Sequence, residues 1–497
     1  MKELRTFKIR INDDKLNNKL LSFIYKYRHF ENILLILIKQ NYDLFKAGKE
    51  NNDFALLTNK QLLRNALMEY KTKNTNKSHY LMNKYKDNQL FTDLLALSKE
   101  IKQHNFVYTI GNVKSQYQNF FNAVKYNKNA RPPKPKKLSK LVNYSIDIDK
   151  DCSLSFKKLK HNLIGINLSD KMIYLHCCYD AFIKLTDIDS PHSAKLVYDN
   201  GLLYLNVSYY KEIPDYEAKP IKEAGIDIGV NNLAAIFIND RETKSIIIDG
   251  KPYKKYNSDF NRFIAKLNIS KSNEVMEWAI SKSKTKYPKK YTLRGRKISK
   301  FINFLYHKRN EFFSDSFHKI AKRILEYLMS AEVTDLYISK NLPELKNNGE
   351  CKLRKSIKQT FIQMPFGKLL NILEYKAKEY GINIHVIDEA YSSKSSCISD
   401  NVLDVQANPY LSNALSGKRD KRGLFKDILI NKVFNADING AVNHIKIGIN
   451  KSFEWLKDYL FKLCNPIKIK CDYEFCKLLQ NSVSGKSFNL TLIKGGV

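Results

Sequence analysis

A single aspartate inside an apolar strand constrains this chain more than any other feature. Residues 225–237 read GIDIGVNNLAAIF, which predicts a strand, a tight turn and a second strand. Asp227 lies between Ile226 and Ile228, where a carboxylate is costly to bury unless a positive group neutralises it. A divalent metal ion would do this, and such ions serve phosphodiester chemistry. The alternative is an aspartate that only caps the turn at Gly229.

The charge of the chain indicates a polyanionic partner. Its 497 residues include 85 Lys and Arg against 50 Asp and Glu, which leaves a net charge of +35. Such an excess predicts binding to a long nucleic acid through phosphate contacts that weaken with salt. No apolar run approaches the roughly 20 residues of a membrane span, and the charged start predicts no signal peptide. We therefore expect no membrane partner and a location in a reducing, prokaryotic cytoplasm with free thiols.

The first half alternates between strand and helix patterns. Residues 6–11 alternate as a strand, residues 18–127 show helical periodicity, and residues 142–216 return to strand patterns. Asp199-Asn200-Gly201 is a hairpin signal between two of these strands. We expect a small β-barrel that includes the first strand, with the helical domain inserted into it.

The second half follows the element order of a ribonuclease-H-like fold. Three strands begin at the Asp227 motif, and then come a long helix over residues 298–329, a strand, a helix that breaks at Pro365, and a fifth strand over residues 382–388. A last short helix carries Asp437. The fold class is therefore α+β and multidomain, with predicted boundaries at 1–17, 18–141, 142–216, 217–394, 395–432, 433–450 and 451–497.

Three carboxylates are the candidate catalytic and metal-binding residues. A two-metal nuclease needs acids from distant elements that hold two ions about 3.5–4 Å apart. Asp227 is the first, Glu389 at the end of the fifth strand is the second, and Asp437 is the third. Glu344 is an alternative for the middle position, and Asp388 would face the other side of its strand. As alternatives, Glu389 would be a surface acid, and Asp437 a charge stabilised by a helix N-terminus.

Basic segments are the candidate nucleic-acid contacts. They include the Pro-rich stretch of residues 130–137, the region before and within the long helix, and a loop near residue 420. A solvated linker or a solvated charged face is the alternative in each case. The predicted contacts are Lys134, Lys136, Lys137, Arg294, Arg296, Lys308, Arg309, Lys394, Lys418, Arg419 and Arg422.

Several of these motifs resemble one protein family. Residues 225–234, 361–377, 389–394, 416–424 and 435–441 are similar to the RuvC blocks of transposon-encoded TnpB nucleases and of compact, V-F-like type V CRISPR effectors. The resemblance implies a wedge barrel, a helical recognition domain, a target-nucleic-acid-binding insertion and a RuvC nuclease that uses Mg²⁺. It further implies PAM-dependent cleavage of double-stranded DNA, directed by a guide RNA on which two protein copies assemble.

Two departures from that family affect these expectations. Most relatives carry the middle glutamate after the fourth strand, whereas this chain offers Glu389 later. Relatives also hold the insertion with cysteine pairs on zinc, but here only Cys397 lies in that region, and Cys464, Cys471 and Cys476 have irregular spacing. We therefore expect no zinc. A TnpB nuclease, a nuclease-dead DNA-binding repressor and a guide-free resolvase or transposase remain as alternatives.

Overall fold

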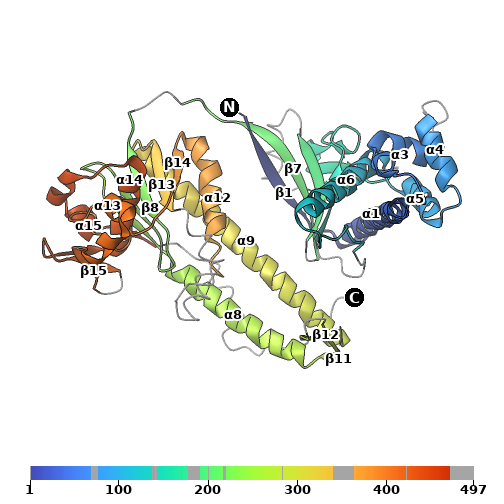
Figure 1. Cartoon of the computed structure of the whole chain (residues 1–497). Helices are drawn as coiled ribbons and strands as arrows, with labels where there is room; N and C mark the ends of the chain where they lie inside the picture. The colour runs from blue at the N-terminus through green and yellow to red at the C-terminus, as the bar shows by residue number, and fades with distance from the viewer. Residues whose placement is uncertain are drawn as a thin grey trace. The chain divides into compact units, whose positions relative to one another are not determined.

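The computed structural model describes most of the chain as two compact units, Met1–Glu212 and Ile213–Val497 (Figure 1). None of the helices described is both long and apolar enough to span a membrane. The residues described are 2–68, 76–136, 138, 143–169, 171–176, 191–199, 201–216, 220–281, 284–339, 363–420 and 423–470.

The first unit contains a helical part that agrees with the predicted periodicity. Asparagine side chains begin two of its helices, because Asn59 and Asn88 accept hydrogen bonds from the first backbone N–H groups. Fully buried aromatic side chains such as Tyr27, Phe106 and Tyr117 form its core. The helices are α1 (Asp14–Lys46), α2 (Phe54–Leu57), α3 (Lys60–Leu67), α4 (Asn76–Tyr85), α5 (Gln89–Glu100) and α6 (Gln103–Tyr126).

The strands of this unit form two separate antiparallel sheets in the described residues. The first has the order β1 (Lys2–Ile11), β7 (Leu202–Glu212), β6 (Ser193–Asp199), β2 (Asn143–Ile148). The second has the order β3 (Leu154–Ser155), β4 (Leu163–Asn167), β5 (Met172–His176), and a 3₁₀ turn, η2 (Leu159–His161), precedes β4.

The long-range pairing of the first strand is as predicted. The strand β1 pairs with β7 along its whole length, although the two are far apart in sequence. The predicted hairpin is also present, since Asp199 pairs with Leu202 across a turn in which Gly201 has a φ of +95°. A single closed barrel is not confirmed.

The second unit is built on one mixed sheet. Its order is β14 (Asn383–Ile387), β13 (Asp335–Ser339), β8 (Glu223–Asp227), β9 (Asn232–Ile238), β10 (Ile246–Asp249), β18 (Ile467–Ile469). The successive strands β8, β9 and β10 pair antiparallel, whereas β13 and β14 run parallel to β8, and β18 runs parallel to β10. The five strands predicted from the sequence are thus confirmed. The sixth, β18, was not expected, because three residues are too short for a readable pattern.

Helices cover both faces of this sheet (Figure 1). Ile226 and Ile236 face the core beneath α9 (Leu293–Ser330) and α12 (Phe366–Ala377). Ala235 and Phe237 face the other core, which contains α14 (Ala436–Ile449). This alternation is the two-residue period of a strand buried on both faces. After α12, a 3₁₀ turn, η3 (Lys378–Tyr380), ends at Gly381 in the left-handed conformation, and α12 begins directly after Pro365, as predicted.

Several elements of the second unit were not predicted. The helix α8 (Lys251–Ser272) runs beside α9 and is joined to it through the hairpin β11 (Val275–Ile280) and β12 (Lys286–Tyr291) (Figure 1). The predicted insertion contains a small sheet, although its sequence shows little apolar periodicity. The remaining elements are α13 (Val402–Ala407), η4 (Pro409–Asn413), β15 (Gly417–Arg419), β16 (Leu424–Asp427), β17 (Lys432–Asn435), η5 (Glu454–Asp458) and α15 (Phe461–Cys464).

Candidate metal-dependent active site

Asp227 is the last residue of the central strand β8, and helix α14 packs closely against it. A Cβ atom added at Gly440 of α14 would stand 2.9 Å from Asp227 Oδ2. A Cβ at Gly225 would clash with the backbone of Ala441 in the same helix. The two glycines therefore allow the helix to approach the strand at the position of the carboxylate. Asp227 is half-buried there.

Asp437 lies in the first turn of α14, but it does not cap the helix. Asn435 is the N-cap residue, and its Oδ1 accepts hydrogen bonds from the backbone N–H groups of Asp437 and Ile438, both at 3.0 Å. The Asp437 carboxylate instead accepts a hydrogen bond of 2.6 Å from Asn232 Nδ2 and lies 3.8 Å from the guanidinium of Arg419. Because Asn435 supplies the cap, the Asp437 carboxylate is directed at the side chains of Asn232 and Arg419.

Glu389 follows the parallel strand β14 and lies beside a buried histidine. His444 Nε2 is 3.8 Å from Glu389 Oε2, and His444 Nδ1 is 2.9 Å from the carbonyl oxygen of Ile226. Since a carbonyl oxygen only accepts, Nδ1 donates this hydrogen bond. Burial lowers the pKa of His444, while the charge of Glu389 and the bond to Ile226 oppose this shift. His444 therefore connects the strand of Asp227 with Glu389.

The three acids influence one another electrostatically. Burial, then Asp437, then Glu389 raise the pKa of Asp227 to about 8, and Arg419 opposes them. Burial and the two neighbouring carboxylates disfavour the ionised form of Asp227. A divalent cation bound here would offset both effects and stabilise the ionised form. Carboxylate and amide oxygens are also the ligands that Mg²⁺ prefers. The donor types at this end of the sheet therefore suit the predicted metal, although the ligand atoms of the three acids do not all lie within 4.8 Å of one another in the described structure.

Polar side chains on one face of α14 form hydrogen bonds to the backbone of the segment that follows Glu389. Asn439 Nδ2 donates to the carbonyl oxygen of Ser395 at 2.9 Å, and Asn443 Nδ2 donates to that of Ser392 at 2.8 Å. Lys446 Nζ donates to the carbonyl oxygen of Cys397 at 2.6 Å. The side chains of Asn439, Asn443 and Lys446 are buried. These bonds hold the Glu389 and Asp437 segments together.

Sequence reasoning missed Asn232, Gly440 and His444. Asn232 belongs to the motif that contains Asp227, so its proximity to the site was available from the sequence. His444 lies seven residues after Asp437, which places both on neighbouring positions of one helix face. His444 is one of several polar residues, with Asn439, Asn443 and Lys446, that interrupt the apolar pattern of α14, and such interruptions are a signal that could have identified it.

Most of the predicted nucleic-acid contacts that the structure describes are exposed. This holds for Lys134, Lys136, Arg294, Arg296, Lys394, Lys418 and Arg419.

Two predicted contacts are half-buried and engaged with other residues. The guanidinium of Arg309 donates to Asn257 Oδ1 at 2.7 Å and also to the carbonyl oxygen of Gln363. Lys308 forms an ion pair of 2.9 Å with Glu311. Their nucleic-acid contacts, like those of the exposed residues, stay predictions. Lys137, Arg422 and the alternative acid Glu344 lie outside the described residues.

Cys397 is buried in the core around α14 and is a free thiol. Burial is the largest of the influences that raise the pKa of this thiol to about 12. A protonated thiol in an apolar core behaves as a small hydrophobic side chain. The one described cysteine of the insertion thus has a packing role.

Two families match separate segments of the chain. Residues 206–343 match the OrfB_IS605 family, described as a probable transposase, and residues 366–444 match the Cas12f1-like TNB domain. No curated protein matches the sequence at a significant level.

Solved structures similar to the chain include two Cas12f complexes and one RNA-guided endonuclease. The "Cryo-EM structure of the Cas12f1-sgRNA-target DNA complex" has 14% identity and a TM-score of 0.43, over 89% of this chain and 98% of that chain. The "Structure of the mini-RNA-guided endonuclease CRISPR-Cas_phi3" has 10% identity and a TM-score of 0.43, over 90% and 92%. The "Cryo-EM structure of CRISPR-Cas12f Ternary Complex" has 15% identity and a TM-score of 0.32, over 88% and 98%.

The two family matches agree with the resemblance that the motifs predict. They cover the strand of Asp227 in one segment and both Glu389 and Asp437 in the other. Each match covers one segment of the chain, with a family described as a probable transposase for the first and a Cas12f1-like domain for the second. In these segments the chain is similar to the compact type V, TnpB-related nucleases.

Proposed function

We propose that the chain is an RNA-guided, PAM-dependent DNA endonuclease of a CRISPR system, with a RuvC site formed by Asp227, Glu389 and Asp437. The observation that carries the proposal is the packing of α14, where Gly440 lies against Asp227 and His444 contacts both Ile226 and Glu389, so that acids from β8, the segment after β14 and α14 meet at one end of the sheet. The order and directions of the first five strands are those expected of a ribonuclease-H-like sheet.

The three carboxylates would hold Mg²⁺. When bound, such ions activate the attacking water and stabilise the leaving oxygen of the phosphodiester. Asn232 keeps the Asp437 carboxylate in one orientation through its hydrogen bond. Arg419 is exposed on β15 and lies beside Asp437, where its guanidinium suits a phosphate of the substrate strand.

The partners in this proposal are a guide RNA and a double-stranded DNA target, with two protein copies on one guide. The net charge of +35 supports polyanionic partners in general. It does not distinguish RNA from DNA, so the guide is tested separately, by sequencing the RNA that copurifies with the protein. Repeat-derived RNA with variable spacers would favour the CRISPR proposal, and RNA from the end of a mobile element would favour a TnpB nuclease. The absence of RNA would contradict both and favour a guide-free nuclease.

The catalytic test compares single variants in a cleavage assay and in a guided-binding assay. We expect Asp227→Ala, Glu389→Ala and Asp437→Ala each to abolish cleavage while binding of guide and target persists. Asp388→Asn is the matched control, because Asp388 is exposed and its Oδ1 accepts the N–H of Ala390, a role that asparagine retains. Cleavage by Glu389→Ala at the wild-type rate would exclude Glu389, and loss in Glu344→Ala would then assign the middle position to Glu344.

A further inference from the structure

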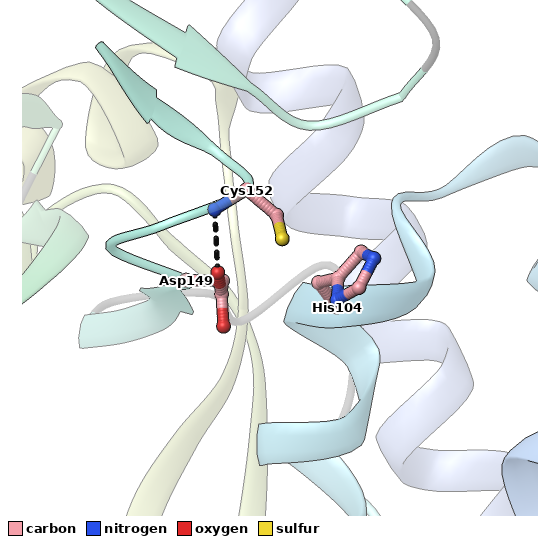
Figure 2. A group of neighbouring side chains, drawn as sticks. All are labelled: His104, Asp149 and Cys152. Atoms are coloured by element: carbon pink, nitrogen blue, oxygen red, sulfur yellow. Dashed lines mark hydrogen bonds between the residues drawn. The ribbon is translucent and has the colours of Figure 1, made fainter.

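A second group of metal-ligating side chains lies in the first unit, among residues that the catalytic proposal does not use. His104, Asp149 and Cys152 each offer one ligand atom, and these atoms all lie within 4.8 Å of one another (Figure 2). His104 comes from the first turn of α6, whereas Asp149 and Cys152 belong to the turn between β2 and β3. Among the residues that the structure describes, this is the one group of its kind.

Hydrogen bonds place these two segments firmly against each other. Asn105, which follows His104, is fully buried. Its Oδ1 accepts the backbone N–H of Asp149 at 2.9 Å, and its Nδ2 donates to the carbonyl oxygen of Asn167 at 2.8 Å. The position of His104 relative to Asp149 is therefore determined by a buried side chain of the adjacent residue. Such preorganisation is what a metal site requires.

The turn presents Asp149 and Cys152 together. Asp149 Oδ1 accepts the backbone N–H groups of Asp151 at 3.1 Å and of Cys152 at 2.7 Å, and the second of these bonds is drawn in Figure 2. The other oxygen, Oδ2, is 3.3 Å from the hydroxyl of Tyr108. Each carboxylate oxygen has two lone pairs, so these bonds leave capacity for a cation. In the described part of this very basic chain, no lysine or arginine forms an ion pair with Asp149.

We propose that His104, Asp149 and Cys152 bind one Zn²⁺ ion, with water in the fourth position. A thiolate, an imidazole and a carboxylate together favour zinc over Mg²⁺ or Ca²⁺, which prefer oxygen ligands alone. Zinc bonds are about 2.0–2.3 Å long, so the three ligand atoms need to approach one another by only about 1 Å. Cys152 is exposed, which gives a water molecule and the ion access.

Bound zinc would join the start of α6 to the β2–β3 turn, and so connect the helical part of the first unit to its strands. This role does not depend on the proposed nuclease activity. It revises the expectation of no zinc, which rested on the cysteines of the insertion and of the C-terminal segment. The sequence contains no short metal-binding motif here, because His104 and Asp149 are 45 residues apart (149 − 104).

The test measures zinc content and stability of the full-length, reduced protein after incubation with Zn²⁺ and removal of free metal. We expect one zinc per chain to depend on Cys152, so that Cys152→Ser and His104→Gln lose it. Asp149→Asn should also lose it while keeping the turn, since the asparagine oxygen accepts the same N–H groups. Cys464→Ser is the matched control, because Cys464 is an exposed free thiol of the second unit.

Two further readouts identify the ligands and detect misfolding. With Co²⁺ in place of Zn²⁺, the wild type should show a thiolate-to-metal charge-transfer band that Cys152→Ser lacks. Zinc should raise the unfolding midpoint of the wild type by about 2–4 °C and leave that of Asp149→Asn unchanged. Wild-type protein that retains no zinc, or a Cys152→Ser variant that retains as much as the wild type, would overturn the proposal.

Discussion

Gly440 of helix α14 lies directly against Asp227, so that this helix touches the carboxylate at the end of strand β8. A Cβ atom at Gly440 would stand 2.9 Å from Asp227 Oδ2. Contacts this short are essentially absent for real side chains, so any larger residue must displace the carboxylate or the helix. The absence of a side chain at Gly440 is thus a condition for the geometry of the candidate site.

Gly440→Ala should therefore impair the site more than the fold. We expect the displaced Asp227 carboxylate to weaken Mg²⁺-dependent cleavage about tenfold or more, because small misplacements at a catalytic centre are costly. Gly367→Ala is the matched control, since Gly367 lies in helix α12 and a Cβ atom added there would meet open space. That variant should leave cleavage unchanged and stabilise α12 by about 0.5–1 kcal/mol. Equal cleavage by both variants would contradict the proposed role of Gly440.

His444 is expected to control metal affinity through Glu389. In His444→Asn, the amide can still donate to the carbonyl oxygen of Ile226, but the ring atoms that face Glu389 are lost. The Mg²⁺ concentration for half-maximal cleavage should rise about tenfold, as for other residues that orient metal ligands. His385→Asn is the control, because His385, in the middle of β14, bonds with Asp335, the first residue of β13, and in the described part of the chain forms no hydrogen bond to Glu389. A similar shift in both variants would indicate a general effect on the sheet.

The protonation of Asp227 predicts a pH dependence of metal binding. Its pKa rises from 3.8 to about 8, chiefly through burial, so the metal-free folded protein holds this proton at neutral pH. Mg²⁺ must displace this proton when it binds. The affinity of the protein for Mg²⁺ should therefore rise with pH, by up to about tenfold per pH unit below about pH 8, and level off at higher pH. Calorimetric titration at several pH values measures this slope. Asp227→Asn should remove it, whereas Asp388→Asn should retain it.

The same pKa shift has a consequence for stability without metal. A carboxyl group whose folded pKa is raised stabilises the fold fully below its unfolded pKa, and this contribution is lost as the pH rises from about 4 to 8. Unfolding of metal-free wild type should therefore become easier over this range, relative to Asp227→Asn. Denaturant titrations of both proteins at pH 5 and pH 8 make the comparison. Parallel changes in the two proteins would show that Asp227 is not the responsible group.

The parts of the site that were predictable from sequence are those encoded in short segments. Asp227 and Asp437 stand in local motifs, and Glu389 ends a readable strand. The bonds from Asn443 to Ser392 and from Lys446 to Cys397 join residues about 50 positions apart, so no local pattern indicates them. Their effect on the site depends on how α14 packs, which only the fold determines.

The missed elements have different causes. In α8, Tyr253, Tyr256, Phe260 and Ile264 are buried at helical spacing, so the local pattern of residues 253–264 is sufficient to predict this helix. Barrel closure, by contrast, depends on pairing between strands that are each readable alone, and local alternation does not determine it. The zinc-ligand group of the first unit is likewise a product of tertiary contacts.

The C-terminal segment contributes a buried lysine whose loss should destabilise the second unit. Lys462 Nζ donates to the carbonyl oxygen of Ile238 at 3.0 Å and to Asp240 Oδ1 at 3.1 Å, and its side chain is fully buried. Burial lowers the pKa of Lys462, and the bond to Asp240 opposes this. Although burial raises the pKa of Asp240, hydrogen bonds from Lys222, Thr243 and Lys462 hold it well below the usual range.

Lys462→Ala should therefore cost about 1–3 kcal/mol of unfolding free energy, because the carbonyl oxygen of Ile238 loses this donor while Asp240 keeps its bonds to Lys222 and Thr243. Lys457→Ala, at an exposed position of η5, should stay within about 0.5 kcal/mol of the wild type. Since the folded pKa of Asp240 is depressed, the stability it contributes is present above about pH 4 and is lost as the pH falls below that value. The difference between the two variants should accordingly shrink in acid. Equal stability of both variants at neutral pH would mean that the C-terminal segment is not part of this core.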